Sequence, residues 1–302
     1  TGGRGMKFDR KESHKSGWDV MQDKVFSLYK DRGQEPLRKA LVVFCGDTAV
    51  DGVNKTQGRL SFNEAAVISQ GYGPVNAAAR RINAPVYLID IGLQKDTTAI
   101  SGILHQKVIH GTHHGYPAMD KETAERAVSA GMAVAQAVIR QGIEAVGLGH
   151  VGERYMLSAL AVTTAALHQR LENATRKNGY RLHLKEVGNL AENPLEVLAA
   201  TGSTEIVAMF GFITVCAKNG VAVVFDDAVS GAAALAATIV YPEVLSGIFP
   251  SLAYDEPVHK MQMQALHMEP MLHYGITGGA GLGAAAGLSF LDRIMMNYGK
   301  AE

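Results

Sequence analysis

Several features that would narrow the function are missing from this 302-residue sequence. It contains two cysteines, Cys45 and Cys216, far apart and each inside an apolar run, which favours core packing over a disulfide or a metal site. Its 29 basic and 29 acidic residues cancel, and no basic stripe with interleaved aromatic residues occurs. These absences argue against nucleic acid as a partner.

Segments that direct a chain to or through a membrane are also missing. No apolar run approaches the roughly 18 residues of a membrane-spanning helix, and no signal peptide is evident. We therefore expect a cytoplasmic protein without a membrane partner. The opening Thr-Gly-Gly-Arg-Gly-Met resembles a tag remnant, with the natural start expected at Met6. With 47% hydrophobic residues, the chain is long enough for one large domain or two unequal ones.

Short apolar runs that end in Gly or Asp predict the strands of a parallel sheet. They lie at 41–45, 86–90, 144–149 and 221–225. Helical spacing is found at 11–31, 61–82 with a break at 71–74, 123–140, 158–173, 194–202, 205–218, 230–240, 259–272 and 283–298. Residues 172–185 are expected to form a polar surface excursion, and 245–257 an irregular segment.

The alternation of strands and helices predicts an α/β fold: a Rossmann-like, doubly wound, mostly parallel sheet with ligands bound beyond the carboxyl ends of its strands. We expect residues 1–35 to hold the tag remnant and a first helix, and residues 36–272 to form the α/β domain. Residues 273–302 then supply a Gly-rich turn and a C-terminal helix. The two terminal helices are predicted to form a small helical subdomain.

The Gly-rich run at 274–290 is the most distinctive stretch of the sequence. Gly278, Gly279, Gly281 and Gly283 can adopt positive φ and let backbone N–H groups approach an anion at the start of a helix. A tight turn that only allows close helix packing is an equally good interpretation. The turn contains no acid, base or nucleophile, so any role depends on backbone and shape.

Polar residues follow the predicted strands where a ligand would bind. Asp47 could hold a ribose or order a loop. His150, in Gly147-Leu-Gly-His-Val-Gly152, could act as an acid or base, donate a hydrogen bond, or be an ordinary loop histidine. One of Asp226 and Asp227 is expected to cap the following helix. The predicted substrate-binding residues are Asp47, Gly147, Gly149, His150, Gly152, Asp226, Gly279 and Gly281.

Metal ligands are not evident. His110, His113 and His114 lie close together, but no carboxylate or cysteine stands at ligand spacing from them. We therefore expect no metal site and no cofactor.

Seven motifs, taken in order, resemble the nicotinate-nucleotide:dimethylbenzimidazole phosphoribosyltransferase (CobT-like) family between Lys39 and Tyr298. They are Gly46-Asp-Thr-Ala-Val, Gly71-Tyr-Gly-Pro-Val-Asn76, Gly147-Leu-Gly-His-Val-Gly152, Asn193-Pro-Leu-Glu-Val-Leu198, Val223-Val-Phe-Asp-Asp-Ala228, Ala265-Leu-His-Met-Glu-Pro-Met-Leu272 and the Gly-rich turn. The resemblance implies a Rossmann-like domain, a small helical domain and a dimer. It also implies the chemistry: an aromatic base displaces nicotinate from nicotinate mononucleotide, giving the α-riboside phosphate of a cobamide lower ligand.

The departures from the family pattern fall on its functional positions. The family's catalytic glutamate, in a Gly-Glu-Gly turn, corresponds to Ala280 here, and its second glutamate to His150. The phosphate-binding segment reads Arg154-Tyr-Met-Leu-Ser158, and a phosphate-binding serine falls near Tyr254. The resemblance therefore assigns no catalytic residue to this chain.

This pattern resembles the non-catalytic, ArsB-type subunit of the two-subunit, ArsAB-like branch that activates phenol and p-cresol. The expected partner is a paralogous CobT-like subunit in a heterodimer, with nicotinate mononucleotide and an aromatic base as substrates of the complex. Two alternatives stay open: a self-sufficient transferase whose base is reassigned to His150 or Glu153, or a non-catalytic protein that binds a small molecule.

Overall fold

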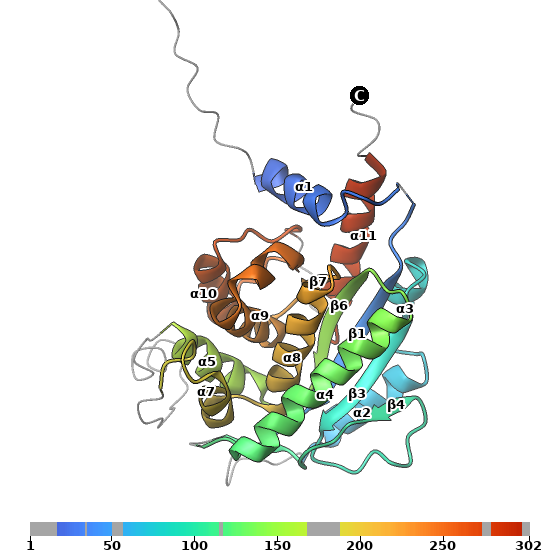
Figure 1. Cartoon of the computed structure of the whole chain (residues 1–302). Coiled ribbons are helices and arrows are strands. Elements are labelled where there is room, and N and C mark those ends of the chain that lie inside the picture. Colours follow the sequence, from blue (N-terminus) through green and yellow to red (C-terminus); the bar gives the residue numbers. More distant parts are fainter. Residues whose placement is uncertain are drawn as a thin grey trace, which may run out of the picture.

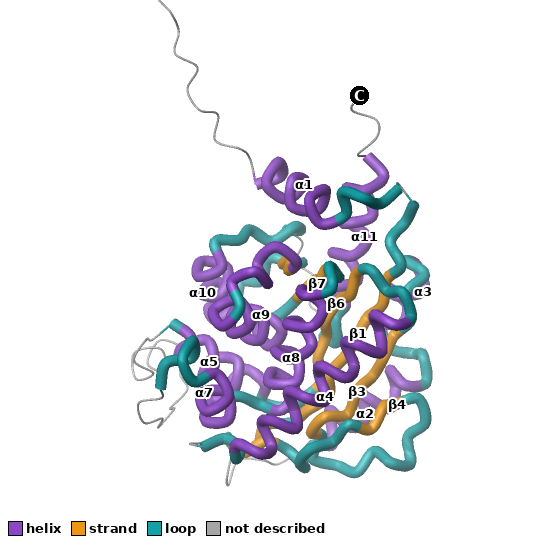
Figure 2. Tube along the Cα trace, viewed as in Figure 1, coloured by secondary structure: helices purple, strands orange, loops and turns teal. Residues whose placement is uncertain are grey.

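The computed structural model describes residues 17–33, 35–49, 57–114, 117–167, 188–273 and 279–297. Its main sheet is formed by β1 (Lys39–Gly46), β3 (Val86–Gly92), β4 (Ile103–His105), β6 (Ala145–Val151), β7 (Ala222–Phe225) and β8 (Ile248–Pro250). The spatial order is β4-β3-β1-β6-β7-β8, and every neighbouring pair is parallel. Figure 2 shows these strands between helices. The predicted doubly wound α/β fold is confirmed.

The central strand β1 is buried along its whole length. Because side chains alternate between the faces of a strand, Val42 and Phe44 join one apolar cluster, whereas Val43 and Cys45 join the other. A strand buried on both faces needs an unbroken apolar run, which explains why this strand could be predicted.

Helices cover both faces of the sheet (Figure 1). One cluster packs under α4 (Lys121–Arg140), α5 (Tyr155–Ala166), α7 (Pro194–Thr201), α8 (Thr204–Lys218), α9 (Ala228–Val240) and α10 (Pro257–Leu266). The opposite cluster packs under α1 (Gly17–Leu28), α2 (Arg59–Ser69), α3 (Pro74–Arg81) and α11 (Leu282–Asn297). The fold therefore has three layers, helix, sheet and helix.

The two terminal helices contact each other, and Trp18 of α1 meets Phe290 of α11 edge to face, with ring centroids 5.5 Å apart. The same helix α11 also packs on the sheet through Ala284 and Leu288, which belong to the β1 and β7 cluster. A separate subdomain of the chain ends stays a prediction, as do the boundaries after residues 35 and 272.

Some local predictions were wrong. The segment 245–257, predicted irregular, contains the short helix η1 (Pro242–Gly247) up to Gly247 and then strand β8 of the main sheet. The helix predicted over 259–272 ends at Leu266, because His267 adopts a left-handed conformation with φ 51°. Strand β4 was not predicted, nor was the small ladder of β2 (Thr48–Ala49) with β5 (Thr112–His113).

The predicted polar excursion at 172–185 lies outside the described residues, as does the start of the Gly-rich run at 274–278. No helix in the part of the chain that the structure covers is both long and apolar enough to cross a membrane. Cys45 and Cys216 are buried free thiols, as expected.

Candidate active site

The order of the strands reverses direction between β1 and β6. The polar residues at the carboxyl ends of the strands come together at that point. From β1 the chain goes outward to β3 on one side, whereas β6 leads to β7 on the other. A Cβ on Gly152 would lie 1.9 Å from the carbonyl oxygen of Gly46, so the loops after β6 and β1 touch at a glycine. In doubly wound folds this crevice binds the ligand.

Asp47, directly after β1, uses both carboxylate oxygens to order this crevice. Oδ2 accepts a hydrogen bond from the Gln94 backbone N–H at 2.8 Å, and Oδ1 accepts one from the Glu153 N–H at 2.9 Å. Burial raises the pKa of Asp47, and these hydrogen bonds oppose the rise. Of the two roles weighed for Asp47, the structure displays the ordering of loops.

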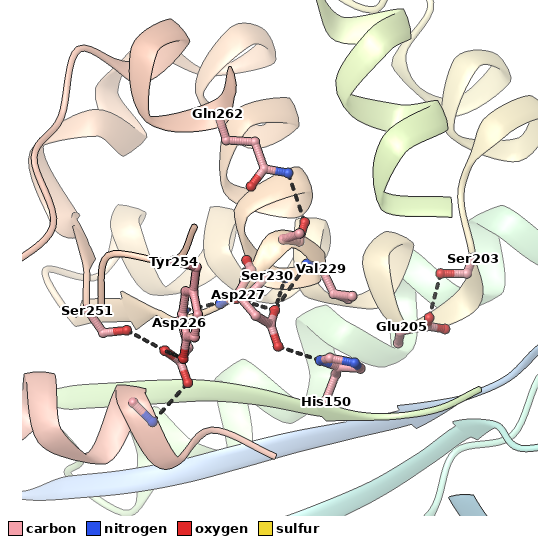
Figure 3. A network of polar contacts seen from close by, with 12 residues as sticks. His150, Ser203, Glu205, Asp226, Asp227, Val229, Ser230, Ser251, Tyr254 and Gln262 are labelled. Atoms are coloured by element: carbon pink, nitrogen blue, oxygen red, sulfur yellow. Dashed lines mark hydrogen bonds and ion pairs between the residues drawn. The ribbon is translucent and has the colours of Figure 1, made fainter. Parts of the chain in front are cut away.

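His150, at the end of β6, pairs with Asp227 at the start of α9. His150 Nδ1 lies 2.5 Å from Asp227 Oδ2, as Figure 3 shows. Burial lowers the pKa of His150, but the charge and hydrogen bond of Asp227 outweigh it, and the net pKa is raised. Burial raises the pKa of Asp227, and the opposing charge of His150 brings it down to about 2. The pairing therefore favours the charged form of each group.

Asp227 also accepts hydrogen bonds from the N–H groups of Val229 and Ser230, each at 3.0 Å. The prediction that one of the two aspartates caps α9 is confirmed, and Asp227 is the one. His150 is further enclosed by Tyr155, whose ring centroid is 4.3 Å away. The imidazole is thus held in place by its neighbours from two helices.

Glu205 lies in the same region and was not predicted. It is fully buried near the start of α8, where Ser203 Oγ donates a hydrogen bond to Oε1 at 2.6 Å. Burial raises its pKa to about 7. A Cβ on Gly46 would lie 2.3 Å from Glu205 Oε2, so the glycine at the end of β1 makes room for this carboxylate.

Asp226 bridges β7 to the helix that follows the Gly-rich turn. Its carboxylate accepts hydrogen bonds from Ser251 Oγ at 2.6 Å and Tyr254 Oη at 2.8 Å (Figure 3). It also accepts one from the Gly283 backbone N–H at 2.9 Å. Burial, reinforced by the charge of Asp227, raises its pKa to about 6. The first turn of α11, where a helix attracts anions, is therefore occupied by a carboxylate of the chain itself.

The described part of the Gly-rich turn lies against β6. A Cβ on Gly149 would come within 2.3 Å of the carbonyl carbon and oxygen of Ala280. Positive φ occurs at Gly281, 90°, and at Ala280, 59°, but not at Gly279 or Gly283. Gly147 is also a packing position, since a Cβ there would meet Leu41 at 2.5 Å.

A cavity of about 250 Å³ opens between this turn and α2. Gly279 and Ala280 line one wall, Val67 and Ile68 the other, and Glu64 faces across, with Oε1 3.8 Å from the position of a Cβ on Gly279. Burial raises the pKa of Glu64, and the charge of His150 opposes the rise. Sequence reasoning missed Glu64, which occupies an ordinary polar position of an amphipathic helix.

The site brings together residues that sequence reasoning had singled out separately. Asp47 with Glu153, His150 with Asp227, and Gly149 with Ala280 and Gly281 are direct neighbours. Glu153 Oε1 also accepts a hydrogen bond from the Leu60 backbone N–H at 3.0 Å. Among the described residues, no group of three or more His, Cys, Asp or Glu side chains has the geometry to hold a metal ion.

Comparison with known proteins identifies the family. The family described as phosphoribosyltransferase (DBI_PRT) matches residues 23–298. The chain belongs to this phosphoribosyltransferase family. It is similar to the nicotinate-nucleotide–dimethylbenzimidazole phosphoribosyltransferase of Acetivibrio thermocellus, with 27% identity over 278 residues, 86% of this chain and 79% of the relative. The enzyme of the same name from Desulforamulus reducens is 29% identical over 276 residues, covering 86% and 79%.

Solved structures agree with this assignment. The crystal structure of CobT from Thermus thermophilus matches with a TM-score of 0.78 and 26% identity, over 93% of this chain and 91% of that one. A second structure of the phosphoribosyltransferase from this organism gives the same TM-score at 25% identity, over 92% and 88%. The chain therefore shares the fold of these structures along more than nine-tenths of its length.

Proposed function

We propose that the chain is one subunit of an enzyme that transfers phosphoribose from nicotinate mononucleotide to an aromatic base, to make the lower ligand of a cobamide. Family membership supports a pentosyltransferase, and the names of the relatives supply nicotinate nucleotide as donor and a benzimidazole as acceptor. The finer part of the proposal is that this chain does not catalyse alone. It supports a catalytic paralogue in a heterodimer, as in the ArsAB-like branch that uses phenol or p-cresol.

The observation that carries this proposal is that residue 280 is an alanine, whose methyl side chain cannot accept a proton. The resemblance of the Gly-rich turn to Gly-Glu-Gly assigns a proton-accepting glutamate to this position, and here the residue is a buried alanine. The acceptor must lose a proton when it attacks the ribose carbon. A positioned base typically supplies about 10²- to 10⁴-fold in rate, which Ala280 does not.

The surroundings of α11 support the same conclusion. A ribose phosphate would use the N–H groups at the start of this helix, beside the carboxylate of Asp226, which belongs to a motif that the chain shares with the family. Tyr254 covers the same carboxylate, near the position assigned to a phosphate-binding serine. A phosphate would therefore meet a bulky ring in a site that normally offers small donors.

A second candidate function has an observation in its favour. A self-sufficient transferase needs a carboxylate or imidazole that reaches the acceptor. His150 is held by Asp227, and Glu153 accepts a hydrogen bond from Leu60, whereas Glu64 lines the cavity beside Ala280. If the chain catalyses alone, Glu64 is the base that its geometry favours.

One experiment separates these functions. The purified chain, a paralogue that retains Gly-Glu-Gly, and their mixture are assayed for riboside phosphate formation from nicotinate mononucleotide with phenol, p-cresol or dimethylbenzimidazole. We expect no turnover by the lone chain and turnover by the mixture. Activity of the lone chain that is lost in Glu64→Gln and kept in Glu153→Gln would favour the second candidate and exclude the partner role.

A further inference from the structure

A larger cavity lies away from the candidate active site, beneath α1. Its volume is about 920 Å³, within the roughly 300–1,000 Å³ typical of small-molecule sites. It lies between α1, η1 and the chain just after α10, and it is open to solvent on one side. Its lining is mainly apolar and includes Val20, Met21, Leu245 and Leu266. Figure 1 shows α1 near the end of the sheet where α11 finishes, whereas His150 lies at the carboxyl end of β6.

One lysine, Lys24, is among the residues that line this cavity. Its Nζ donates a hydrogen bond to the carbonyl oxygen of Ile248 at 2.5 Å and lies 4.6 Å from the centroid of the Phe249 ring. No ion pair connects it to a carboxylate within the described ranges. The titratable side chains that line the same cavity are Glu243, His267 and Glu269, all exposed at its rim.

Burial lowers the pKa of Lys24 to about 7. At pH 7.5 about three quarters of such an amine is neutral, whereas an ordinary lysine is neutral in only about one molecule in a thousand. A neutral amine in an apolar pocket is the form that attacks carbonyl carbon. The hydrogen bond to Ile248 uses an N–H and leaves the nitrogen lone pair free.

We propose that this cavity is a second binding site, for a small molecule with an apolar body and an aldehyde group, and that Lys24 forms an imine with it. The nitrogen lone pair adds to the carbonyl carbon, and the carbonyl oxygen takes the displaced electron pair. Both amine hydrogens then leave with that oxygen as water, and a C=N double bond remains. No oxidant or reductant is needed.

The test uses the full chain with 4-methylbenzaldehyde, and sodium cyanoborohydride fixes any imine as a stable amine. Peptide mapping by mass spectrometry then gives the labelling rate of each lysine. We expect Lys24 to be labelled at least about tenfold faster than Lys260, an exposed lysine of α10, at pH 7.5. The Lys24 rate should reach half its maximum near pH 7.

Two variants make the result specific. Lys24→Met should remove the fast adduct, while Lys260→Met should keep it. Leu245→Trp keeps the amine but fills the cavity, and it should slow Lys24 labelling to the rate of the exposed lysines. Lys24 labelling no faster than Lys260 in the folded chain would overturn the proposal, as would unchanged fast labelling in Leu245→Trp. Both results are readable even if Lys24→Met does not fold.

Discussion

His150 Nδ1 and Asp227 Oδ2 lie 2.5 Å apart, His150 at the end of β6 and Asp227 at the start of α9. This one pair therefore connects strand β6 to helix α9. Removing one partner of a buried pair leaves the other charge without compensation. We expect His150→Ala to lower the free energy of unfolding by about 3–5 kcal/mol. Urea denaturation measures it, with the exposed His110→Ala as control. Equal effects of the two variants would contradict the assignment.

The same pair predicts a pH window for stability. The folded pKa of His150 is raised above 6.5, so its contribution is complete below pH 6.5 and is lost as the pH rises through the folded value. The pKa of Asp227 is lowered from 3.8 to about 2, so its contribution is complete above pH 3.8 and is lost toward pH 2. The stability difference between wild type and His150→Ala should therefore be largest between about pH 4 and 6.5. A difference that grows above pH 8 would contradict this.

Glu205 makes the stability of the fold depend on pH in the opposite direction from a paired carboxylate such as Asp227. Because burial raises its pKa from 4.5 to about 7, the folded chain holds the proton more tightly than the unfolded chain does. Stability therefore falls as the pH rises from 4.5 to 7, by about 3 kcal/mol from this group. Glu205→Gln keeps an acceptor for Ser203 and should remove this fall. Thermal unfolding of the wild type and of Glu205→Gln at pH 5 and pH 8 measures this fall. An equal loss of stability in the two proteins between these pH values would show that Glu205 does not cause it.

The contact between β6 and the Gly-rich turn predicts that Gly149 cannot be replaced by a residue with a side chain without loss of stability. An alanine Cβ at Gly149 would sit 2.3 Å from the backbone of Ala280, and backbone atoms at that distance must move. We expect Gly149→Ala to cost more than about 2 kcal/mol, as overpacked core sites do. Gly33→Ala, where nothing lies within 4 Å, should change stability by less than about 0.5 kcal/mol. Chemical denaturation of both variants measures the contrast.

Restoring the acid at position 280 should not create an enzyme. Ala280→Glu returns a carboxylate, but Tyr254 still lies near the position that the resemblance assigns to a phosphate-binding serine, where its hydroxyl donates to Asp226. A base gains little rate without a positioned substrate. The lone Ala280→Glu chain should therefore stay inactive with nicotinate mononucleotide and phenol, whereas the glutamate-to-alanine change in the paralogue should silence the complex. Turnover by the lone variant would show that the phosphate region is intact.

The parts of the fold that could be predicted are those encoded by local patterns. Val42 and Phe44 belong to an unbroken apolar run, which is what a strand buried on both faces requires. Strand β8 has only three residues, Ile248–Pro250, and follows directly after Gly247. Strand β8 forms because it pairs with β7, and its own three residues carry no pattern that predicts a strand.

The candidate site was only partly predictable, for a related reason. His150, Asp226 and Asp227 follow apolar strands, so their position at the sheet edge can be read from the chain. Glu64 and Glu205 lie on helices, where an acid is ordinary, and only the fold brings them to Ala280 and Gly46. The pairing of His150 with Asp227 joins residues 77 positions apart, which no local pattern reports.

The two outermost strands limit how this chain can associate with another. Strands β4 and β8 have three residues each, and Pro250 at the end of β8 has no N–H to donate. Short edge strands present few unpaired backbone groups, and proline at an edge blocks ladder extension. A sheet running continuously from one subunit into the next is thereby disfavoured. Among the described residues, this favours a dimer built from side-chain contacts of helices and loops over one built by extending the main sheet.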